Sequence, residues 1–348
     1  MKKLSFGLLT VALVFTACTK QNDLLPQQNK DIASNEPATE SYKPLVYFID
    51  KDTLYAIKNI GTANSIVEKK AALVNVALFN NMRSNVFNMV SAPGMPRQRV
   101  IYNPFLNRMV VAKGTELNRC FIPSRTNSKL SLNNTAQGAT VLRVGPDKKL
   151  YYFSWGNWWN PGPQLRSMQM DGTNDHTIVD YVAQNNPKPP LAGGEINFDD
   201  NVIYVPIADG NIYVSKLHQS GIAKIFVPAK LGETFLESEI RYDALHHKIF
   251  FSSIVASQKI RRIYSMDALG NLNTIKKIAQ VQYTDDNHTF TFDIVPSANT
   301  VVFSKREFNQ NLQKHTSVVT KVKMDGTGLK PLFFGTYINT VVTADVGN

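Results

Sequence analysis

The feature that most constrains this fold is an internal repeat of short runs rich in β-branched and aromatic residues. Six such runs begin at intervals of 41 to 63 residues, and their length and composition are typical of buried strands. A strand-forming unit that recurs at this period indicates a repeat architecture, in which neighbouring units cover one another's apolar faces. The runs occupy residues 46–49, 109–111, 150–153, 202–205, 249–252 and 301–304.

Turn formers and further strand-like segments flank these runs. Five runs follow an apolar segment that ends in an aromatic residue or Val and then a turn former, as at residues 242–244 and 292–294. A third segment follows the run and ends in a tight turn, most clearly Met-Asp-Gly-Thr at 170–173 and 324–327. A fourth apolar segment comes next. The unit is therefore predicted to be a four-stranded antiparallel meander.

A single meander cannot cover both of its faces, whereas several sheets packed radially can. The sequence predicts an all-β fold, a single six-bladed β-propeller of four-stranded antiparallel blades over residues 45–348. The first unit lacks an innermost strand before Val46, and residues 340–345 have the composition of one. We therefore expect the C-terminal strand to complete blade one and close the ring. An array of two sandwich domains is the alternative.

The combined pattern of aromatic-Asp, Tyr-Phe-Ser and Met-Asp-Gly-Thr resembles the six-bladed propellers of the YWTD (low-density-lipoprotein-receptor) and TolB-like type. The resemblance covers nearly all of residues 45–348 and is clearest at 152–154 together with 170–173. The Asp that ends the receptor motif is replaced here by Trp155, Ser253 and Lys305, so the family's between-blade hydrogen bonds are not implied. A role as a subunit of a cell-envelope complex is implied by the TolB-like resemblance.

The N-terminal segment is typical of an export signal. Two lysines precede an apolar run over residues 4–17, which is too short to span a bilayer as a helix. Residues 15–18 resemble the lipobox of bacterial lipoproteins, with Phe15 in place of the usual Leu. The resemblance implies a signal peptide over residues 1–17 and lipid on Cys18, which would anchor the chain to a membrane. An ordinary signal peptide with an incidental Cys is the alternative.

Residues 18–44 are predicted to form the lipidated Cys and a flexible stalk, because they are rich in Gln, Asn, Pro and charge. Lipid on Cys18 leaves Cys120 single, so no intrachain disulfide is expected. The family's sorting pattern, with Thr19 rather than Asp after the Cys, favours the outer membrane. Because no acidic run follows, the periplasmic face is favoured over the surface.

The chain is basic, with a formal net charge of +11. Export makes nucleic acid an unsuitable partner, and the Lys and Arg residues are not concentrated in one run. Two interpretations stay open: a solvated positive surface, or attraction to anionic lipid headgroups, cell-wall polymers or acidic glycans. We expect a monomer.

Three candidate sites follow from side-chain chemistry. The first is a loop expected between the second and third strands of blade three, with Trp155, Asn157, Trp158, Trp159 and Asn160. Indole rings beside amides are suited to stacking on sugars and bonding to them. The same indoles could instead pack on the neighbouring blade.

The second candidate is the channel mouth, with Arg99, Glu195 and Glu239 near the starts of inner strands. Carboxylates from adjacent blades could bind a cation, or could form a solvated rim pair with Arg99 or Arg241. The third candidate is a possible metal site of Asp285, Asp286 and His288 on the loop entering the last blade, which could equally be ordinary loop chemistry.

No catalytic signature occurs in the sequence, so no catalytic residue is assigned and no cofactor is required. The favoured function is a membrane-anchored, non-enzymatic binding or scaffold lipoprotein of the cell envelope, acting on a glycan or a partner protein. The alternative is a metal-dependent hydrolase or lactonase of the six-bladed class, which would hold a divalent cation such as calcium at the channel mouth.

Overall fold

The computed structural model of this chain is all-β, with six four-stranded antiparallel sheets among the residues that it describes. The described residues are 46–50, 53–72, 100–103, 108–113, 116–121, 126–130, 138–155, 164–180, 194–206, 212–218, 222–226, 239–282, 290–309, 311, 313–336 and 338–343.

The strands follow one another as successive meanders, which we number as sheets one to six. Sheet one contains β24 (Ile338–Thr343), β1 (Val46–Asp50), β2 (Thr53–Lys58) and β3 (Ile66–Ala72). Sheet two contains β4 (Val100–Asn103), β5 (Arg108–Lys113), β6 (Glu116–Phe121) and β7 (Thr126–Leu130). Sheet three contains β8 (Gly138–Val144), β9 (Leu150–Trp155), β10 (Gln164–Met168) and β11 (His176–Asp180).

The remaining sheets have the same order along the chain. Sheet four contains β12 (Glu195–Asn197), β13 (Val202–Pro206), β14 (Ile212–Lys216) and β15 (Ile222–Phe226). Sheet five contains β16 (Ile240–Asp243), β17 (Lys248–Val255), β18 (Ile260–Asp267) and β19 (Lys276–Gln282). Sheet six contains β20 (Thr291–Val295), β21 (Thr300–Asn309), β22 (Lys314–Lys323) and β23 (Lys330–Gly335). Short 3-10 turns η2 (Ala256–Gln258), η3 (Leu272–Thr274) and η4 (Pro296–Ala298) lie between strands. In the described part of the chain, no helix has the length and apolar character needed to cross a membrane.

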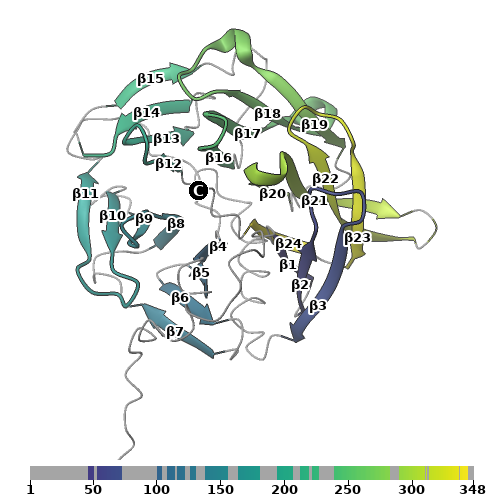
Figure 1. Ribbon diagram of the computed structural model, residues 1–348, viewed down its shortest axis with the longest axis horizontal. Coiled ribbons are helices and arrows are strands. Elements are labelled where there is room, and N and C mark those ends of the chain that lie inside the picture. The colour runs from purple at the N-terminus through teal and green to yellow at the C-terminus, as the bar shows by residue number, and fades with distance from the viewer. Residues whose placement is uncertain are drawn as a thin grey trace, which may run out of the picture. The chain divides into compact units, whose positions relative to one another are not determined.

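The repeated apolar runs form the second strand of each sheet, as the sequence predicts. Figure 1 shows the inner strands β4, β8, β12, β16, β20 and β24 nearest to a common centre, with the other strands farther out. Each inner strand contacts the inner strand of the next sheet, and β24 contacts both β20 and β4. This is the radial packing of a β-propeller.

The C-terminal strand supplies the inner strand of sheet one. β24 pairs antiparallel with β1, with Val46 opposite Thr343 and Phe48 opposite Val341. Val341 and Phe48 are both buried in the cluster between sheets six and one. The two ends of the repeated region therefore share one sheet.

A left-handed residue repeats in the turn between the first and second strands. It is Lys148, Asn201, His247 and Asn299 in sheets three to six, with φ between 49° and 62°. In sheets four to six, the sixth residue before it pairs with the third residue after it. In sheet three the residue that pairs with the third residue after Lys148 is Arg143, five residues before it, because β8 has a bulge there.

The two Met-Asp-Gly-Thr runs form the same turn between the third and fourth strands. The Asp171 carboxylate accepts hydrogen bonds from the Thr173 amide at 2.9 Å and from its hydroxyl at 2.6 Å. Asp325 accepts the equivalent pair from Thr327 at 2.8 and 2.6 Å. The glycine between them has a φ near 90° in both turns, a conformation that side chains disfavour.

One predicted turn is wrong. The sequence pattern placed a turn at Phe292-Asp293-Ile294, but these residues lie inside β20 and the turn follows at η4. The Asp293 side chain is bonded to groups on other sheets rather than to its own turn. A turn former in sequence can therefore be a strand residue when a distant partner satisfies it.

Turns of neighbouring sheets meet at one end of the molecule. In each antiparallel sheet the first–second and third–fourth turns lie at the same end. The Tyr242 hydroxyl bonds to Asp199 at 3.2 Å, and the Tyr204 hydroxyl to the Ala268 carbonyl at 3.0 Å, which joins sheets four and five there. The Lys321 ammonium bonds to the Ile60 carbonyl at 2.9 Å, which joins sheets six and one. We call this end the turn face and the opposite end the loop face.

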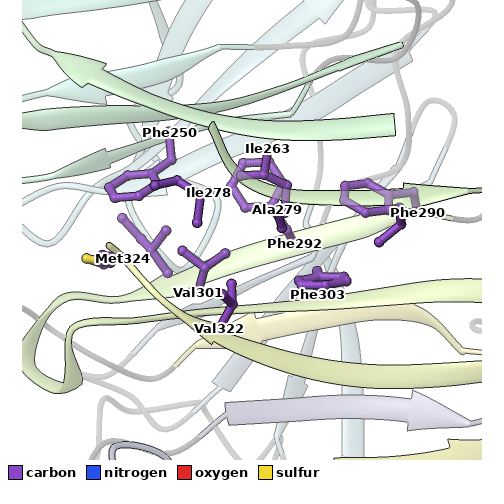
Figure 2. Close-up of a cluster of buried hydrophobic side chains, with 12 residues drawn as sticks. Phe250, Ile263, Ile278, Ala279, Phe290, Phe292, Val301, Phe303, Val322 and Met324 are labelled. Carbon is purple, nitrogen blue, oxygen red and sulfur yellow. The ribbon is translucent and has the colours of Figure 1, made fainter. Parts of the chain in front are cut away.

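Apolar side chains fill the space between sheets. Figure 2 shows the cluster between sheets five and six, where Phe250 and Ile263 face Phe292 and Phe303. All four side chains are essentially inaccessible to water, so this interface buries a large apolar surface that stabilises the packing of sheet five on sheet six.

Candidate functional site

Charged side chains gather where the inner strands approach one another. Arg143, Glu195, Arg241 and Asp293 come from β8, β12, β16 and β20. Each pairs across its hairpin with the third residue after the left-handed turn residue, namely Tyr151, Tyr204, Phe250 and Val302. Four successive sheets therefore carry alternating positive and negative side chains at one register, and we call these four residues the axial girdle.

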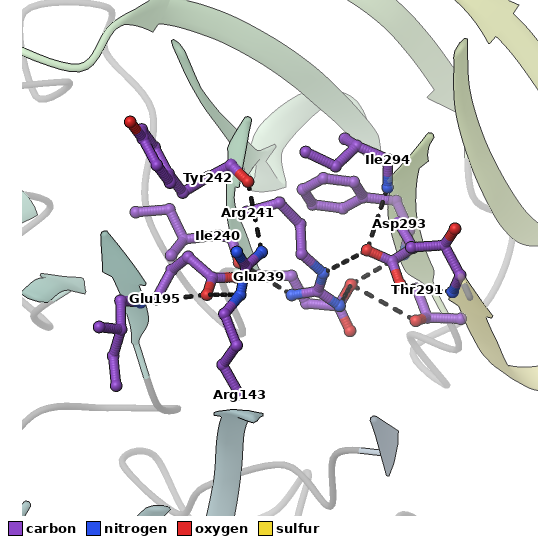
Figure 3. Close-up of polar contacts among 12 residues, drawn as sticks. Arg143, Glu195, Glu239, Ile240, Arg241, Tyr242, Thr291, Asp293 and Ile294 are labelled. Atoms are coloured by element: carbon purple, nitrogen blue, oxygen red, sulfur yellow. Dashed lines mark hydrogen bonds and ion pairs between the residues drawn. The ribbon is translucent and has the colours of Figure 1, made fainter. Parts of the chain in front are cut away.

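Glu195 is the most buried member of the girdle. Its side chain has no exposed surface, and its Oε1 accepts from Arg143 Nε at 2.9 Å and from the Ile196 amide at 3.0 Å. Arg143 also donates through Nη2 to the Tyr242 carbonyl at 3.3 Å, so it links sheets three, four and five. Figure 3 shows the Arg143 guanidinium between Glu195 and Tyr242.

Arg241 forms the second half of the girdle. Its Nε donates to Asp293 Oδ1 at 2.9 Å, and its Nη2 lies 3.6 Å from Glu239 Oε2. The guanidinium also lies over the Phe292 ring, 5.4 Å from the centroid. Burial opposes its charge, but Asp293, Glu239 and Glu195 outweigh that effect and raise the pKa of Arg241 above its ordinary value.

The carboxylates around Arg241 also bond to the neighbouring backbone. Glu239 Oε2 accepts from the Phe292 amide at 2.8 Å, which ties the start of sheet five to sheet six. Asp293 Oδ2 accepts from the Thr343 amide of β24 at 2.8 Å, which ties sheet six to sheet one. Arginine–carboxylate contacts thus join sheet three to sheet four and sheet five to sheet six (Figure 3). The bond from Arg143 to the Tyr242 carbonyl connects the two halves, and the Thr343 amide extends the contacts to sheet one.

The structure places the two carboxylates of the predicted channel mouth at different registers. Glu195 is within β12, while Glu239 precedes β16, so Glu195 is equivalent to Arg241 rather than to Glu239. Each has its own arginine, and the expected rim partner Arg241 is the one near Glu239. The described residues contain no group of three or more His, Cys, Asp or Glu side chains arranged to hold a metal ion.

Sequence reasoning missed Arg143 and Asp293. Both occupy the girdle register, but the aromatic residues used to align the repeat are offset between sheets. Alignment on the left-handed turn residue places Glu195, Arg241 and Asp293 in one column, six residues before it, whereas Arg143 is five residues before Lys148 and reaches the same register through a bulge in β8.

The other predicted site residues fall mostly outside the described residues. These are Cys18, Arg99, Asn157, Trp158, Trp159, Asn160, Asp285, Asp286 and His288. Trp155 is the last residue of β9, and β10 begins at Gln164, so the tryptophan-rich segment does connect the second and third strands of sheet three. The ends of β9 and β10 that it joins are at the loop face.

Comparison with known proteins adds information at the level of the fold. The sequence matches no family model and no curated protein. Nidogen in a nidogen/laminin complex aligns with a TM-score of 0.52 at 7% identity, covering 87% of this chain and 99% of that chain. A putative TolB from Agrobacterium tumefaciens aligns with a TM-score of 0.51 at 12% identity, covering 84% and 90%.

These likenesses, together with the six four-stranded sheets, identify the fold as a β-propeller similar to those of nidogen and TolB.

Proposed function

We propose that this chain is a non-enzymatic binding or scaffold module of the cell envelope, anchored by lipid on Cys18, with its loop face turned to a glycan or a partner protein. The axial girdle carries this proposal. Each of its two carboxylates is bonded to an arginine of a neighbouring sheet, and Asp293 also accepts from the Thr343 amide of sheet one, so these charged groups act in joining sheets. A hydrolytic site would instead need carboxylates that are free to bind a metal or transfer a proton.

The six sheets, on this proposal, are the blades of one closed propeller. The contacts of β24 with both β20 and β4, and its pairing with β1, support closure by the C-terminal strand. A closed ring leaves its two end faces for recognition. The loop face is favoured for the ligand because it includes the connection between Trp155 and Gln164, where three tryptophans occur in the sequence.

The lipid anchor is tested by metabolic labelling with an alkyne fatty acid in a bacterial host. Wild-type chain should carry the label in the outer-membrane fraction, and Cys18→Ser should lose it. Cys120→Ser is the matched control, because Cys120 is the other cysteine of the chain, and should keep the label. Equal labelling of the Cys18→Ser variant would reject the anchor.

Ligand binding is tested with immobilised polysaccharides and the double variant Trp158→Ala/Trp159→Ala. We expect the variant to lose at least tenfold in affinity for any polysaccharide that wild-type chain retains, since each lost aromatic contact removes about 1 kcal/mol or more. Its melting temperature should stay near that of wild-type. A collapse in stability would assign the indoles to packing, and stoichiometric calcium in purified chain would favour the hydrolase instead.

A further inference from the structure

The turn face has two halves of different chemistry. Turns of sheets three and four expose Asp147, Asp171, Asp199 and Asp200. Turns of sheets five, six and one expose apolar side chains instead: Leu245 is 60% exposed, Leu269 83%, Leu329 58% and Ile66 50%. One exposed leucine is ordinary on a protein surface, but four large apolar side chains on adjoining turns are not.

The apolar turns are in direct contact with one another. The Ala268 amide, next to Leu269, donates to the His247 carbonyl of the Leu245 hairpin at 3.0 Å. The Lys330 ammonium, next to Leu329, donates to the Ala63 carbonyl of the turn before Ile66 at 2.9 Å.

Sheets five and six are close at the same end. A side chain added at Gly326 would lie 3.5 Å from the Lys277 carbonyl. The turns of sheets five, six and one therefore form one surface, which we call the turn patch.

Lysines surround the exposed leucines. Lys248, Lys276, Lys277, Lys323 and Lys330 are exposed on the same turns or on the strand residues next to them. Two aspartates lie among them, and both also bond to their own turns: Asp267 to the Leu269 amide at 2.7 Å and Asp325 to the Thr327 amide at 2.8 Å. The turn patch is therefore apolar at its tips and positive between them.

The chain enters the domain beside this patch. Val46, the first residue of β1, pairs with Ile57, and Lys58 pairs with Ile66 across the adjoining hairpin. The N-terminal end of β1 is thus at the turn face, and the segment that bears Cys18 joins the domain there.

We propose that the turn patch rests on the surface of an anionic lipid bilayer, with the leucines in the headgroup region and the lysines paired with lipid phosphates. Apolar tips among lysines are the composition that such an interface selects. The orientation would direct the loop face, and the tryptophan-rich connection, away from the membrane. The proposal deepens the membrane attachment proposed above.

The test is vesicle sedimentation of residues 18–348 carrying Cys18→Ser, which measures binding by the protein surface without the predicted signal peptide or an acyl chain. Vesicles contain phosphatidylcholine alone or with about one third phosphatidylglycerol. We expect binding to the anionic vesicles, weak binding to the neutral ones, and loss of binding in about 0.5 M salt, which screens the lysines.

Two variants of the turn patch identify the surface involved. Lys276→Gln/Lys277→Gln/Lys323→Gln should lower partitioning at least tenfold, because each lysine near an anionic surface contributes roughly fivefold. Leu245→Ser/Leu269→Ser/Leu329→Ser should lower it by a similar factor. The matched control Lys148→Gln/Lys149→Gln/Lys216→Gln removes the same charge from the acidic half of the turn face and should bind nearly as wild-type.

The results that overturn the proposal are distinct from failure of the lipid anchor. Equal losses in the patch and control lysine variants would mean non-specific attraction. Bilayer docking would be excluded if the leucine variant bound vesicles as well as wild-type does. It would also be excluded if the wild-type chain bound the acidic polysaccharide polygalacturonate but did not bind anionic vesicles. Melting temperatures close to wild-type in all variants would show that the losses are not unfolding, as expected for exposed positions.

Discussion

The axis and the turn face use the same charged residue types for different purposes. At the axis, Glu195 and Arg241 are nearly inaccessible to water and bond to groups on neighbouring sheets. On the turn face, Asp171 and Asp325 are exposed and bond within their own turns, while lysines such as Lys276 point to solvent. Charge at the axis joins sheets, whereas charge on the turn face shapes turns and is accessible to a partner.

This difference sets the order of the expected energies. Removing one partner of a buried ion pair costs about 3–5 kcal/mol, because the other charge stays buried without compensation. Exposed ion pairs contribute about 0–1 kcal/mol, since water and side-chain entropy offset the attraction. Substitutions at the axis should therefore mainly change the stability of the fold, and substitutions on the turn face should mainly change binding.

The largest effect is expected from deleting residues 338–348. The deletion removes β24, uncovers Val46 and Phe48, and takes away the Thr343 amide that bonds Asp293. We expect a loss of roughly 5 kcal/mol or more, from the buried apolar surface alone. Thermal unfolding followed by circular dichroism measures it, with deletion of residues 344–348 as the control. A truncated chain that melts like the full chain would contradict the pairing of β24 with β1 in sheet one.

The next largest effect is expected for Arg241→Met. Asp293 and Glu239 would keep their backbone bonds but lose their buried counter-charge, at a cost of about 3–5 kcal/mol in the free energy of unfolding. Urea unfolding measures the loss. Adding Asp293→Asn should restore part of it, because the double variant removes both members of the pair. Additive losses would show that the two side chains do not act on each other.

The sequence predicted the strands better than the partners of the inner strands. Apolar runs such as 202–205 and 301–304 identify second strands because composition and spacing act locally. The start of a fourth strand is less marked in sequence: in sheet five, η3 ends at Thr274 and β19 starts at Lys276. Asp293 was assigned to a turn because its partner, Arg241, lies on another sheet.

The candidate site was predicted by position but not by pairing. Glu195 and Glu239 do lie near the starts of inner strands. Their arginines could not be chosen from the sequence, because a shift of one residue in register changes which side chains meet across adjacent sheets. The turn patch was also missed, since it depends on which turns adjoin in space.

The pH dependence of stability at high pH tests the tyrosines whose hydroxyls bond to aspartates of the turn face. Burial and the Asp147 carboxylate raise the pKa of Tyr151 to about 12, and burial and Asp199 raise that of Tyr242 as well. The stability that Tyr151 provides is complete below the unfolded value of about 10 and is lost as pH rises through about 12. Unfolding midpoints should therefore fall between these pH values, and less steeply in Tyr151→Phe. Parallel curves for the two proteins would contradict this effect.

The smallest stability effect is expected for Asp171→Ala. The substitution removes the acceptor for the Thr173 amide and hydroxyl, and costs about 1 kcal/mol because water can replace the lost acceptor at an exposed turn. Asp325→Ala, in the equivalent turn of sheet six, should lower the melting temperature by a similar small amount, which makes the two turns internal controls for each other.

Vesicle partitioning should distinguish the Asp171→Ala and Asp325→Ala variants. Asp325 lies within the turn patch and its removal should strengthen binding to anionic vesicles, whereas Asp171 lies on the acidic half and its removal should leave binding nearly unchanged. Equal responses would mean that the two halves of the turn face do not differ toward a bilayer.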